Sequence, residues 1–149
     1  MPSPSRETLQ LAQQSGYQFE AQFGGGIAPL RSDLPPPLGQ GVGPSPEMLL
    51  AAAVGNCLAA SLLFSLRKYK EQAEPITADI GTEIGRNAEG RLRVQAIDVV
   101  LKLGQPAAAL KHLDRALAQF EDFCTVTASV RAGVEIKVQV LDAAGERVK

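Results

Sequence analysis

The sequence predicts an α+β domain whose sheet is largely antiparallel. Apolar and polar residues alternate over residues 17–23, 76–84 and 134–140, which is typical of half-buried strands. Two other segments, residues 45–70 and 107–122, carry the apolar spacing and the end signals of helices. The resulting order is strand, long helix, two strands, helix, strand. This order favours the α+β class.

The N-terminal third has the least regular pattern. The length of 149 residues suits a single domain over residues 1–149, in which we expect the polar residues 1–16 to be flexible or weakly helical. Tyr17–Phe23 alternates as a strand. Between Gly24 and Pro46, 12 of 23 residues are Gly or Pro, so we expect a long loop with at most a short strand at Ile27–Leu30. A loop this long in a small domain usually has a function or forms an interface arm.

The long helix begins with clear signals. Ser45 can cap it, Pro46 suits its first turn, and the charge of Glu47 complements the positive helix start. From Met48 to Leu66 there follow 19 residues without a charge. Three basic side chains then suit the negative end of the helix: Arg67, Lys68 and Lys70.

This uncharged run has two interpretations, a membrane span or a core helix. Nineteen uncharged residues meet the length of a span. The run also contains many small residues and lacks the aromatic ends of a span, so we prefer the core helix and expect no membrane. A helix that is apolar all round must be covered all round. Because one small sheet covers one or two sides, we expect a partner, most simply the same helix of a second copy.

The second half of the chain predicts two adjacent strands, a helix and a last strand. Residues 76–84 form the first of these strands. In residues 91–103 the alternation changes parity near Ala96, which predicts a bulge or a bend. Residues 107–122 share an apolar helical face, and residues 134–140 give the clearest strand.

Composition excludes several classes of protein. A net charge of −1 lacks the basic excess of a nucleic-acid binder. Two cysteines and one histidine are too few for a disulfide-rich scaffold or a four-ligand zinc site, so we expect no metal. The N-terminus has no apolar run after a basic start, so it does not read as a signal peptide. We expect a cytoplasmic protein whose thiols are reactive or inert rather than permanently bonded.

The two cysteines, Cys57 and Cys124, are the candidate chemical groups. Each could be a small buried hydrophobic residue without chemistry. Cys57 lies in the apolar helix, where burial is expected to raise the pKa of its thiol. Cys124 precedes a short segment that ends at Gly133, and a helix start there is expected to lower the pKa of the Cys124 thiol.

Two motifs resemble the OsmC/Ohr family of thiol-dependent hydroperoxide reductases. The run from Pro44 to Cys57 resembles a family motif with Pro-Glu-x-Leu-x-x-Ala and a cysteine ten residues after the glutamate. The run from Phe123 to Ile136 resembles the second motif, in which a cysteine precedes a short helix and the final strand. The resemblance covers roughly residues 17–141.

The resemblance implies an OsmC-like fold with a long central hydrophobic helix, an intertwined homodimer and a peroxidase without a bound cofactor. In that family the first cysteine attacks a small hydroperoxide and becomes a sulfenic acid, and the second condenses with it to a disulfide, as thiol oxidation chemistry allows. A dithiol reductant then restores both thiols. By this resemblance Cys57 is the attacking thiol and Cys124 the resolving thiol.

The resemblance also assigns Glu47 and an arginine to the site. The family glutamate holds an arginine against the reactive thiolate, and Glu47 matches it. Ten residues of one helix span about 15 Å, so Glu47 is expected to approach Cys57 of a second copy. The family arginine comes from a segment where this chain has Gly24–Gly26, so the candidates are Arg6 and Arg31, of which Arg31 lies in the loop before the helix. Glu47 could instead be only a helix-start charge, and Arg31 only a solvated loop charge.

Two functions from different classes therefore compete. The first is a thiol peroxidase that reduces organic or other hydroperoxides through a Cys57 sulfenic acid and a Cys57–Cys124 disulfide. The second is a dimer without catalytic activity that binds a small apolar ligand and has inert thiols.

Overall fold

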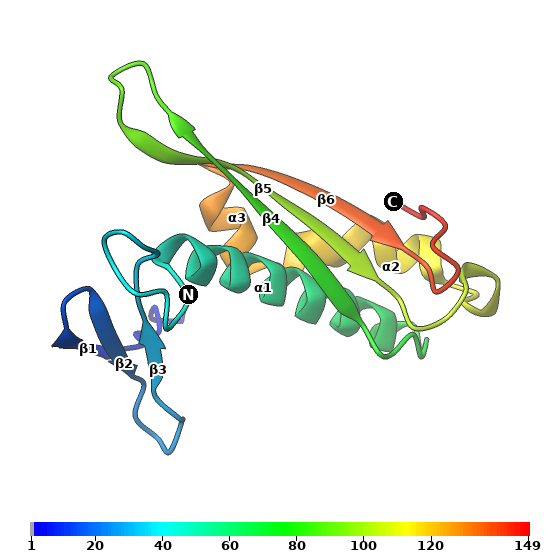
Figure 1. Cartoon of the computed structure of the whole chain (residues 1–149). Coiled ribbons are helices and arrows are strands. Elements are labelled where there is room, and N and C mark those ends of the chain that lie inside the picture. Colours follow the sequence, from blue (N-terminus) through cyan, green and yellow to red (C-terminus); the bar gives the residue numbers. More distant parts are fainter. Residues whose placement is uncertain (1) are drawn as a thin grey trace. The chain divides into compact units, whose positions relative to one another are not determined.

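A computed structural model describes residues 2–149 and groups the chain into two compact units, one up to Leu49 and one over Leu50–Lys149. Each unit has its own three-stranded sheet, and one long helix is present (Figure 1). Of the four strand pairings described, three are antiparallel and one is parallel. The predicted α+β class with a largely antiparallel sheet is thus confirmed. The single domain over residues 1–149 stays a prediction.

The N-terminal unit contains an antiparallel sheet in the order β1-β2-β3. Its strands are β1 (Gln10–Ser15), β2 (Gln18–Gln22) and β3 (Leu30–Ser32). β2 confirms the strand expected at residues 17–23. β1 lies where a flexible or weakly helical segment was expected. It is a strand because its backbone pairs with β2, and its polar side chains give no sign of that pairing.

One buried carboxylate organises the Gly- and Pro-rich loop that follows β3. Asp33 is only 2% exposed, and its oxygens accept hydrogen bonds from the backbone N–H groups of Leu34, Gln40 and Val42. Burial would raise the pKa of Asp33, but these N–H donors lower it. The loop therefore has a defined course despite its composition.

The long helix α1 (Pro46–Lys68) begins and ends as predicted. The Ser45 hydroxyl accepts a hydrogen bond from the backbone N–H of Met48 at 3.3 Å, which is the expected cap. Glu47 lies in the first turn, and Arg67 and Lys68 lie in the last.

The C-terminal unit has a mixed sheet in the order β4-β5-β6. Its strands are β4 (Thr77–Arg86), β5 (Leu92–Lys102) and β6 (Glu135–Leu141). β4 and β5 are antiparallel, and β6 runs parallel to β5. The β4–β5 register shifts so that Gln95 has no partner, which confirms the irregularity predicted next to Ala96.

The connection from β5 to β6 is broken into short pieces, so the single helix expected over residues 107–122 is wrong. The pieces are the 3₁₀ turn η1 (Ala107–Ala109), α2 (Leu113–Gln119), the 3₁₀ turn η2 (Phe120–Phe123) and α3 (Thr125–Val130). Leu110 adopts extended backbone angles after η1. The backbone N–H of His112 donates to the Glu71 carboxylate at 2.8 Å, a tertiary contact that favours a break there.

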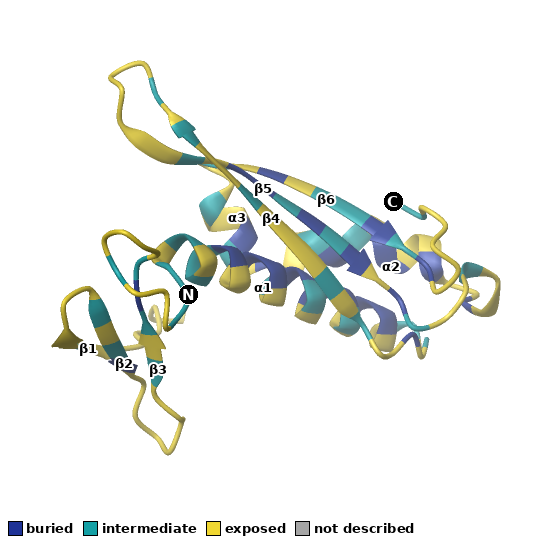
Figure 2. Cartoon of the chain, viewed as in Figure 1, coloured by how far each residue is buried: buried dark blue, intermediate teal, exposed yellow. Residues whose placement is uncertain are grey.

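The core of the C-terminal unit lies between the sheet and the helices on one of its faces (Figure 2). On α1 the side chains at Val54, Leu58, Leu62 and Leu66 are fully buried at intervals of four residues. Gly55 is also buried, and a Cβ there would collide with the side chain of Ile80, which would have to shift to admit a larger residue. α1 is therefore a core helix along one side.

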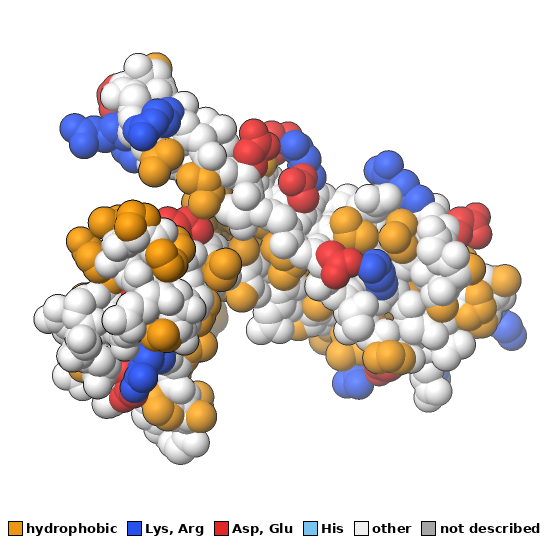
Figure 3. All heavy atoms as spheres, in the orientation of Figure 1, with side chains coloured by type: hydrophobic (Ala, Val, Ile, Leu, Met, Phe, Trp, Pro, Cys, Tyr) orange, Lys and Arg blue, Asp and Glu red, His pale blue; other side chains and the backbone are white. Residues whose placement is uncertain are grey.

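The opposite side of α1 is not covered by residues 2–149. Ala52, Ala53, Asn56 and Ala60 are exposed, and Phe64 is 57% exposed. By length and composition α1 is the one helix of residues 2–149 that could cross a membrane, but core helices of soluble proteins pass the same test. Elsewhere on the visible face of the C-terminal unit, charged side chains of both signs are interspersed (Figure 3).

Candidate functional site

The fold brings the two cysteines together. Cys57 lies in the middle of α1 and is half-buried, whereas Cys124 is the N-cap residue of α3 and is only 1% exposed. Both thiols are free, and they are close enough that each shifts the pKa of the other. Two residues that are 67 positions apart in the sequence thus form one small polar centre in an apolar core.

Hydrogen-bond donors surround the Cys57 sulfur. Burial alone would raise the pKa of the Cys57 thiol, but four donors outweigh it and the pKa is lowered. The donors are the thiol of Cys124, the backbone N–H groups of Val126 and Thr127, and the hydroxyl of Ser61. Cys57 therefore carries more thiolate at neutral pH than an ordinary cysteine does.

Cys124 is shifted in the opposite direction. Burial and the neighbouring Cys57 raise the pKa of the Cys124 thiol, and they outweigh its contact with Thr127. The Cys124 thiol donates to the Thr127 hydroxyl oxygen, with 2.9 Å between Sγ and Oγ1. Of the two thiols, Cys57 therefore ionises at the lower pH.

These directions reverse both sequence expectations about the thiols. The start of α3 follows Cys124, but its N–H groups at Val126 and Thr127 donate to Cys57. Cys57 therefore shares the stabilisation expected for Cys124, and at Cys124 burial and the neighbouring Cys57 outweigh the contribution of the Thr127 hydroxyl and backbone N–H. The direction in which the N–H groups point depends on the packing of α3 against α1, which no local pattern encodes.

Two hydroxyl residues of the site, Ser61 and Thr127, were missed by the sequence analysis. Ser61 is four residues after Cys57 on α1, a spacing that places two side chains on one helix face. Thr127 is three residues after Cys124, in the first turn of α3. Both spacings were visible in the sequence and could have identified them.

Glu47 does not reach Cys57 within one chain. The two residues lie ten positions apart on α1, which is one uninterrupted helix, and ten residues rise about 15 Å. Glu47 is half-exposed at the start of the helix.

Arg31 belongs to the N-terminal unit. It lies in β3, is exposed, and pairs in register with Glu20 of β2. The groups that lower the pKa of Cys57 are instead a thiol, a hydroxyl and two amides, all within residues 50–149. Within residues 2–149, the groups that favour the Cys57 thiolate are therefore neutral donors rather than a cation.

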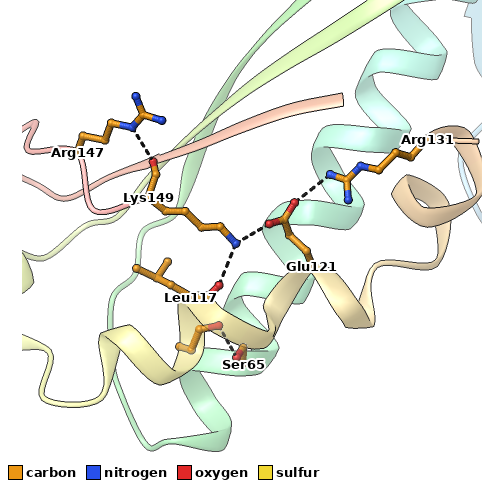
Figure 4. Close-up of polar contacts among 7 residues, drawn as sticks. Ser65, Leu117, Glu121, Arg131, Arg147 and Lys149 are labelled. Carbon is orange, nitrogen blue, oxygen red and sulfur yellow. Dashed lines mark hydrogen bonds and ion pairs between the residues drawn. The ribbon is translucent and has the colours of Figure 1, made fainter. Parts of the chain in front are cut away.

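An ion-pair network holds the segment that carries Cys124 (Figure 4). The Glu121 carboxylate pairs with Arg131 on one side and with Lys149 on the other. Lys149 also donates to the carbonyl of Leu117 at 3.0 Å. Burial would raise the pKa of Glu121, but the two cations lower it. Glu121 thus connects the residues before and after the Cys124 turn.

Neither metal ligation nor the charged cavities compete with the thiol pair as a site. Within residues 2–149 no group of three or more His, Cys, Asp or Glu side chains could hold a metal ion. A cavity of about 840 Å³ is lined largely by charged and amide side chains near the end of α1, including Arg67, Lys70 and Glu71. It contains neither cysteine.

Solved structures share this fold. The chain is similar to an OsmC-like protein of unknown function from Vibrio cholerae, at 16% identity and a TM-score of 0.77 over 93% of this chain and 100% of that one. It is also similar to an organic hydroperoxide resistance protein OsmC from Legionella pneumophila, at 17% identity and a TM-score of 0.70 over 92% and 98% of the two chains. The organic hydroperoxide resistance protein OhrB of Bacillus subtilis gives 14% identity and a TM-score of 0.67 over 89% and 97%. No curated protein matches the chain.

The fold and the thiol pair define an α+β protein with a two-cysteine centre beside a long core helix. The family model described as OsmC-like protein matches residues 39–139, which include both cysteines. This chain belongs to the OsmC family. Proteins of this family are soluble, in agreement with α1 as a core helix rather than a membrane span.

Proposed function

We propose that this protein is a thiol-dependent hydroperoxide reductase. The observation that carries the proposal is the presence of Cys57, whose pKa is lowered, beside Cys124, whose pKa is raised. A thiolate is the nucleophilic form of cysteine, and a neighbouring thiol can condense with the sulfenic acid that the attack produces.

In the first step the Cys57 thiolate attacks the terminal oxygen of a hydroperoxide. A sulfur–oxygen bond forms, the oxygen–oxygen bond breaks, and the alkoxide leaves and takes up a proton to become an alcohol. Cys57 becomes a sulfenic acid.

In the second step the Cys124 sulfur attacks the Cys57 sulfur. A disulfide forms, the sulfur–oxygen bond breaks, and the hydroxide leaves with the thiol proton as water. A dithiol reductant then exchanges with the disulfide, regenerates both thiols and is itself oxidised. No bound cofactor is required by this sequence of steps.

Organic hydroperoxides are the substrate class we propose. The similar proteins from Legionella pneumophila and Bacillus subtilis carry the name organic hydroperoxide resistance protein. In this chain Phe123 precedes Cys124 and is 44% exposed, and its ring meets Phe64 edge to face at 5.3 Å between centroids. This aromatic pair supplies apolar surface beside the turn of the resolving thiol.

We further propose that the protein acts as a homodimer in the cytoplasm. The uncovered side of α1, with Ala52, Ala60 and Phe64, suits close packing against the same helix of a second copy. In such a pair Glu47 and Arg31 of one copy would serve Cys57 of the other. A monomeric mass in sedimentation at micromolar protein would contradict the dimer.

Mass spectrometry after treatment with one equivalent of cumene hydroperoxide tests the reaction. We expect a loss of two hydrogens from the protein and a peptide in which Cys57 is linked to Cys124. Cys124→Ser is the matched variant and should stop at the sulfenic acid. If both wild-type thiols stay reduced in excess peroxide, the alternative of inert thiols in an apolar-ligand-binding dimer takes precedence.

A further inference from the structure

Thr127 occupies an unusual place for a helix hydroxyl. Its side chain is 1% exposed, and its oxygen lies 2.9 Å from the Cys124 sulfur. The usual partner of a Ser or Thr hydroxyl within a helix is the carbonyl four residues earlier. Ser129 on the same helix follows that rule and donates to the carbonyl of Thr125 at 2.9 Å. Thr127 instead contacts the thiol.

We propose that Thr127 is a positioning residue for the resolving thiol, and that its hydroxyl keeps the Cys124 sulfur directed at Cys57 throughout the reaction. This inference rests on the proposed function. It adds to the thiol pair a third residue, which acts through Cys124 and does not touch the peroxide.

The number of hydrogens available at the site supports this role for Thr127. Cys124 carries one thiol hydrogen but has two acceptors within reach, the Cys57 sulfur and the Thr127 oxygen. A hydroxyl can both donate and accept, and its hydrogen rotates to suit its neighbours. When Cys57 is a thiolate, the Cys124 hydrogen belongs on Cys57, and the Thr127 hydroxyl can donate to the Cys124 sulfur. The contact then survives with its direction reversed.

The same contact serves the resolving step. Once Cys57 is a sulfenic acid, it has lost the negative charge that attracted the Cys124 hydrogen, and that hydrogen can turn to Thr127. As the disulfide forms, the Cys124 sulfur is oxidised, the Cys57 sulfur is reduced, and the thiol proton leaves with the hydroxide as water. Thr127 gains and loses no atom. Its hydroxyl holds the attacking sulfur in place within a buried site.

Site-directed variants of the full chain can test this assignment. Thr127→Val keeps the shape of the side chain and removes the hydroxyl, and Thr127→Ser keeps the hydroxyl. Thr125→Val is the control, because Thr125 is exposed on the same helix and its hydroxyl contacts neither thiol. Thr127→Ala is measured beside Thr127→Val, so that poor folding of one variant does not decide the result.

The rate of disulfide closure is the measured quantity, after oxidation by cumene hydroperoxide and separately by diamide. Diamide first forms an adduct at the Cys57 sulfur, which Cys124 then displaces, so it reports closure without peroxide chemistry. We expect Thr127→Val to slow closure about five- to tenfold with either oxidant, as loss of one hydrogen bond would. Cys57 sulfenic acid, trapped with dimedone, should persist correspondingly longer. Thr127→Ser should restore the rate to within about twofold of wild type, and Thr125→Val should leave it unchanged.

Closure at the wild-type rate in Thr127→Val and Thr127→Ala would overturn the proposal. So would a Thr127→Ser variant as slow as Thr127→Val, because the effect would then come from packing rather than from the hydroxyl. If wild-type protein closes with diamide but not with cumene hydroperoxide, the proposed function fails, while the diamide rates still test Thr127.

Discussion

The two cysteines occupy segments of very different construction. Cys57 lies on a 23-residue helix whose buried side chains pack along its length into the core. Cys124 lies between a 3₁₀ turn of four residues and a helix of six. The first segment is fixed by apolar burial, and the second by a small number of polar contacts, of which Glu121 with its two cations is the most extensive.

This difference suits the two roles that we propose for the thiols, attack by Cys57 and resolution by Cys124. An attacking group gains from a fixed position and fixed donors, because catalysis depends on preorganised geometry. A resolving group must approach a neighbouring sulfur to bonding distance, and a short turn can move for that purpose more easily than a core helix. The opposed pKa directions of Cys57 and Cys124 accompany this structural contrast.

Loss of either sulfur should have the largest effect on peroxide consumption. Cys57→Ser should reduce peroxide consumption by at least about 1000-fold, because the nucleophile is removed. Cys124→Ser should retain one rapid turnover and then stall, because only the second step is lost. Rapid-mixing measurement of peroxide consumption distinguishes the two, and equal first turnovers in both variants would contradict the assigned roles.

The pH dependence of the first turnover should show the difference in pKa between the two thiols. Because the pKa of Cys57 is lowered, the rate should rise with pH and reach half its maximum at a lower pH than it would for an ordinary thiol. Absorbance of the thiolate at neutral pH in Cys124→Ser and in Cys57→Ser checks the same point. More thiolate from Cys124 than from Cys57 would reverse the assignment.

Glu121→Gln should loosen the segment of Cys124 without touching that of Cys57. We expect a loss of about 1–2 kcal/mol in the free energy of unfolding, since two charge-assisted contacts weaken. Because the pKa of Glu121 is lowered on folding, its contribution is present above the unfolded value of about 4.3 and is lost as pH falls through the folded value. Urea unfolding at pH 7 and pH 3 measures this. Asp122→Asn is the exposed control, and an equal loss in both variants would rule out a special role for Glu121.

The smallest expected effect concerns a contact between α1 and α2, the helix that precedes the Cys124 segment. The buried Ser65 hydroxyl on α1 donates to the carbonyl of Ala116 on α2 at 3.0 Å. That carbonyl keeps its helical bond from Phe120, so Ser65→Ala should cost only about 0.5–1 kcal/mol. Thermal unfolding measures it, with Ser129→Ala as the exposed control. A cost above that of Glu121→Gln would mean that the helix contact, rather than the ion pairs, holds the segment.

Much of the fold could be predicted from local patterns. The cap at Ser45, the basic end of α1 and the irregularity near Ala96 each follow from a few neighbouring residues. β1 could not be predicted, because its partner strand rather than its own residues makes it a strand. The break near Leu110 was hidden for a similar reason, since it coincides with a contact from His112 to the distant Glu71.

In the candidate site, too, some features follow from local sequence and others depend on tertiary packing. Motif spacing identified both cysteines, but their pKa directions depend on how deeply each sulfur is buried and on which donors lie beside it. Both are properties of tertiary packing. The hydroxyls of Ser61 and Thr127 lay at helical spacings from the thiols and gave a local signal that a search by helix face would detect.

The separation of the two thiols along the chain has a further consequence for the oxidised protein. A bond between Cys57 and Cys124 would close a loop that holds β4, β5 and α2 within 67 positions of sequence. Closing a loop of that length removes chain entropy from the unfolded state worth about 4 kcal/mol. Peroxide would then act on the protein as a stabilising cross-linker, and the melting temperature would report the redox state of the thiol pair.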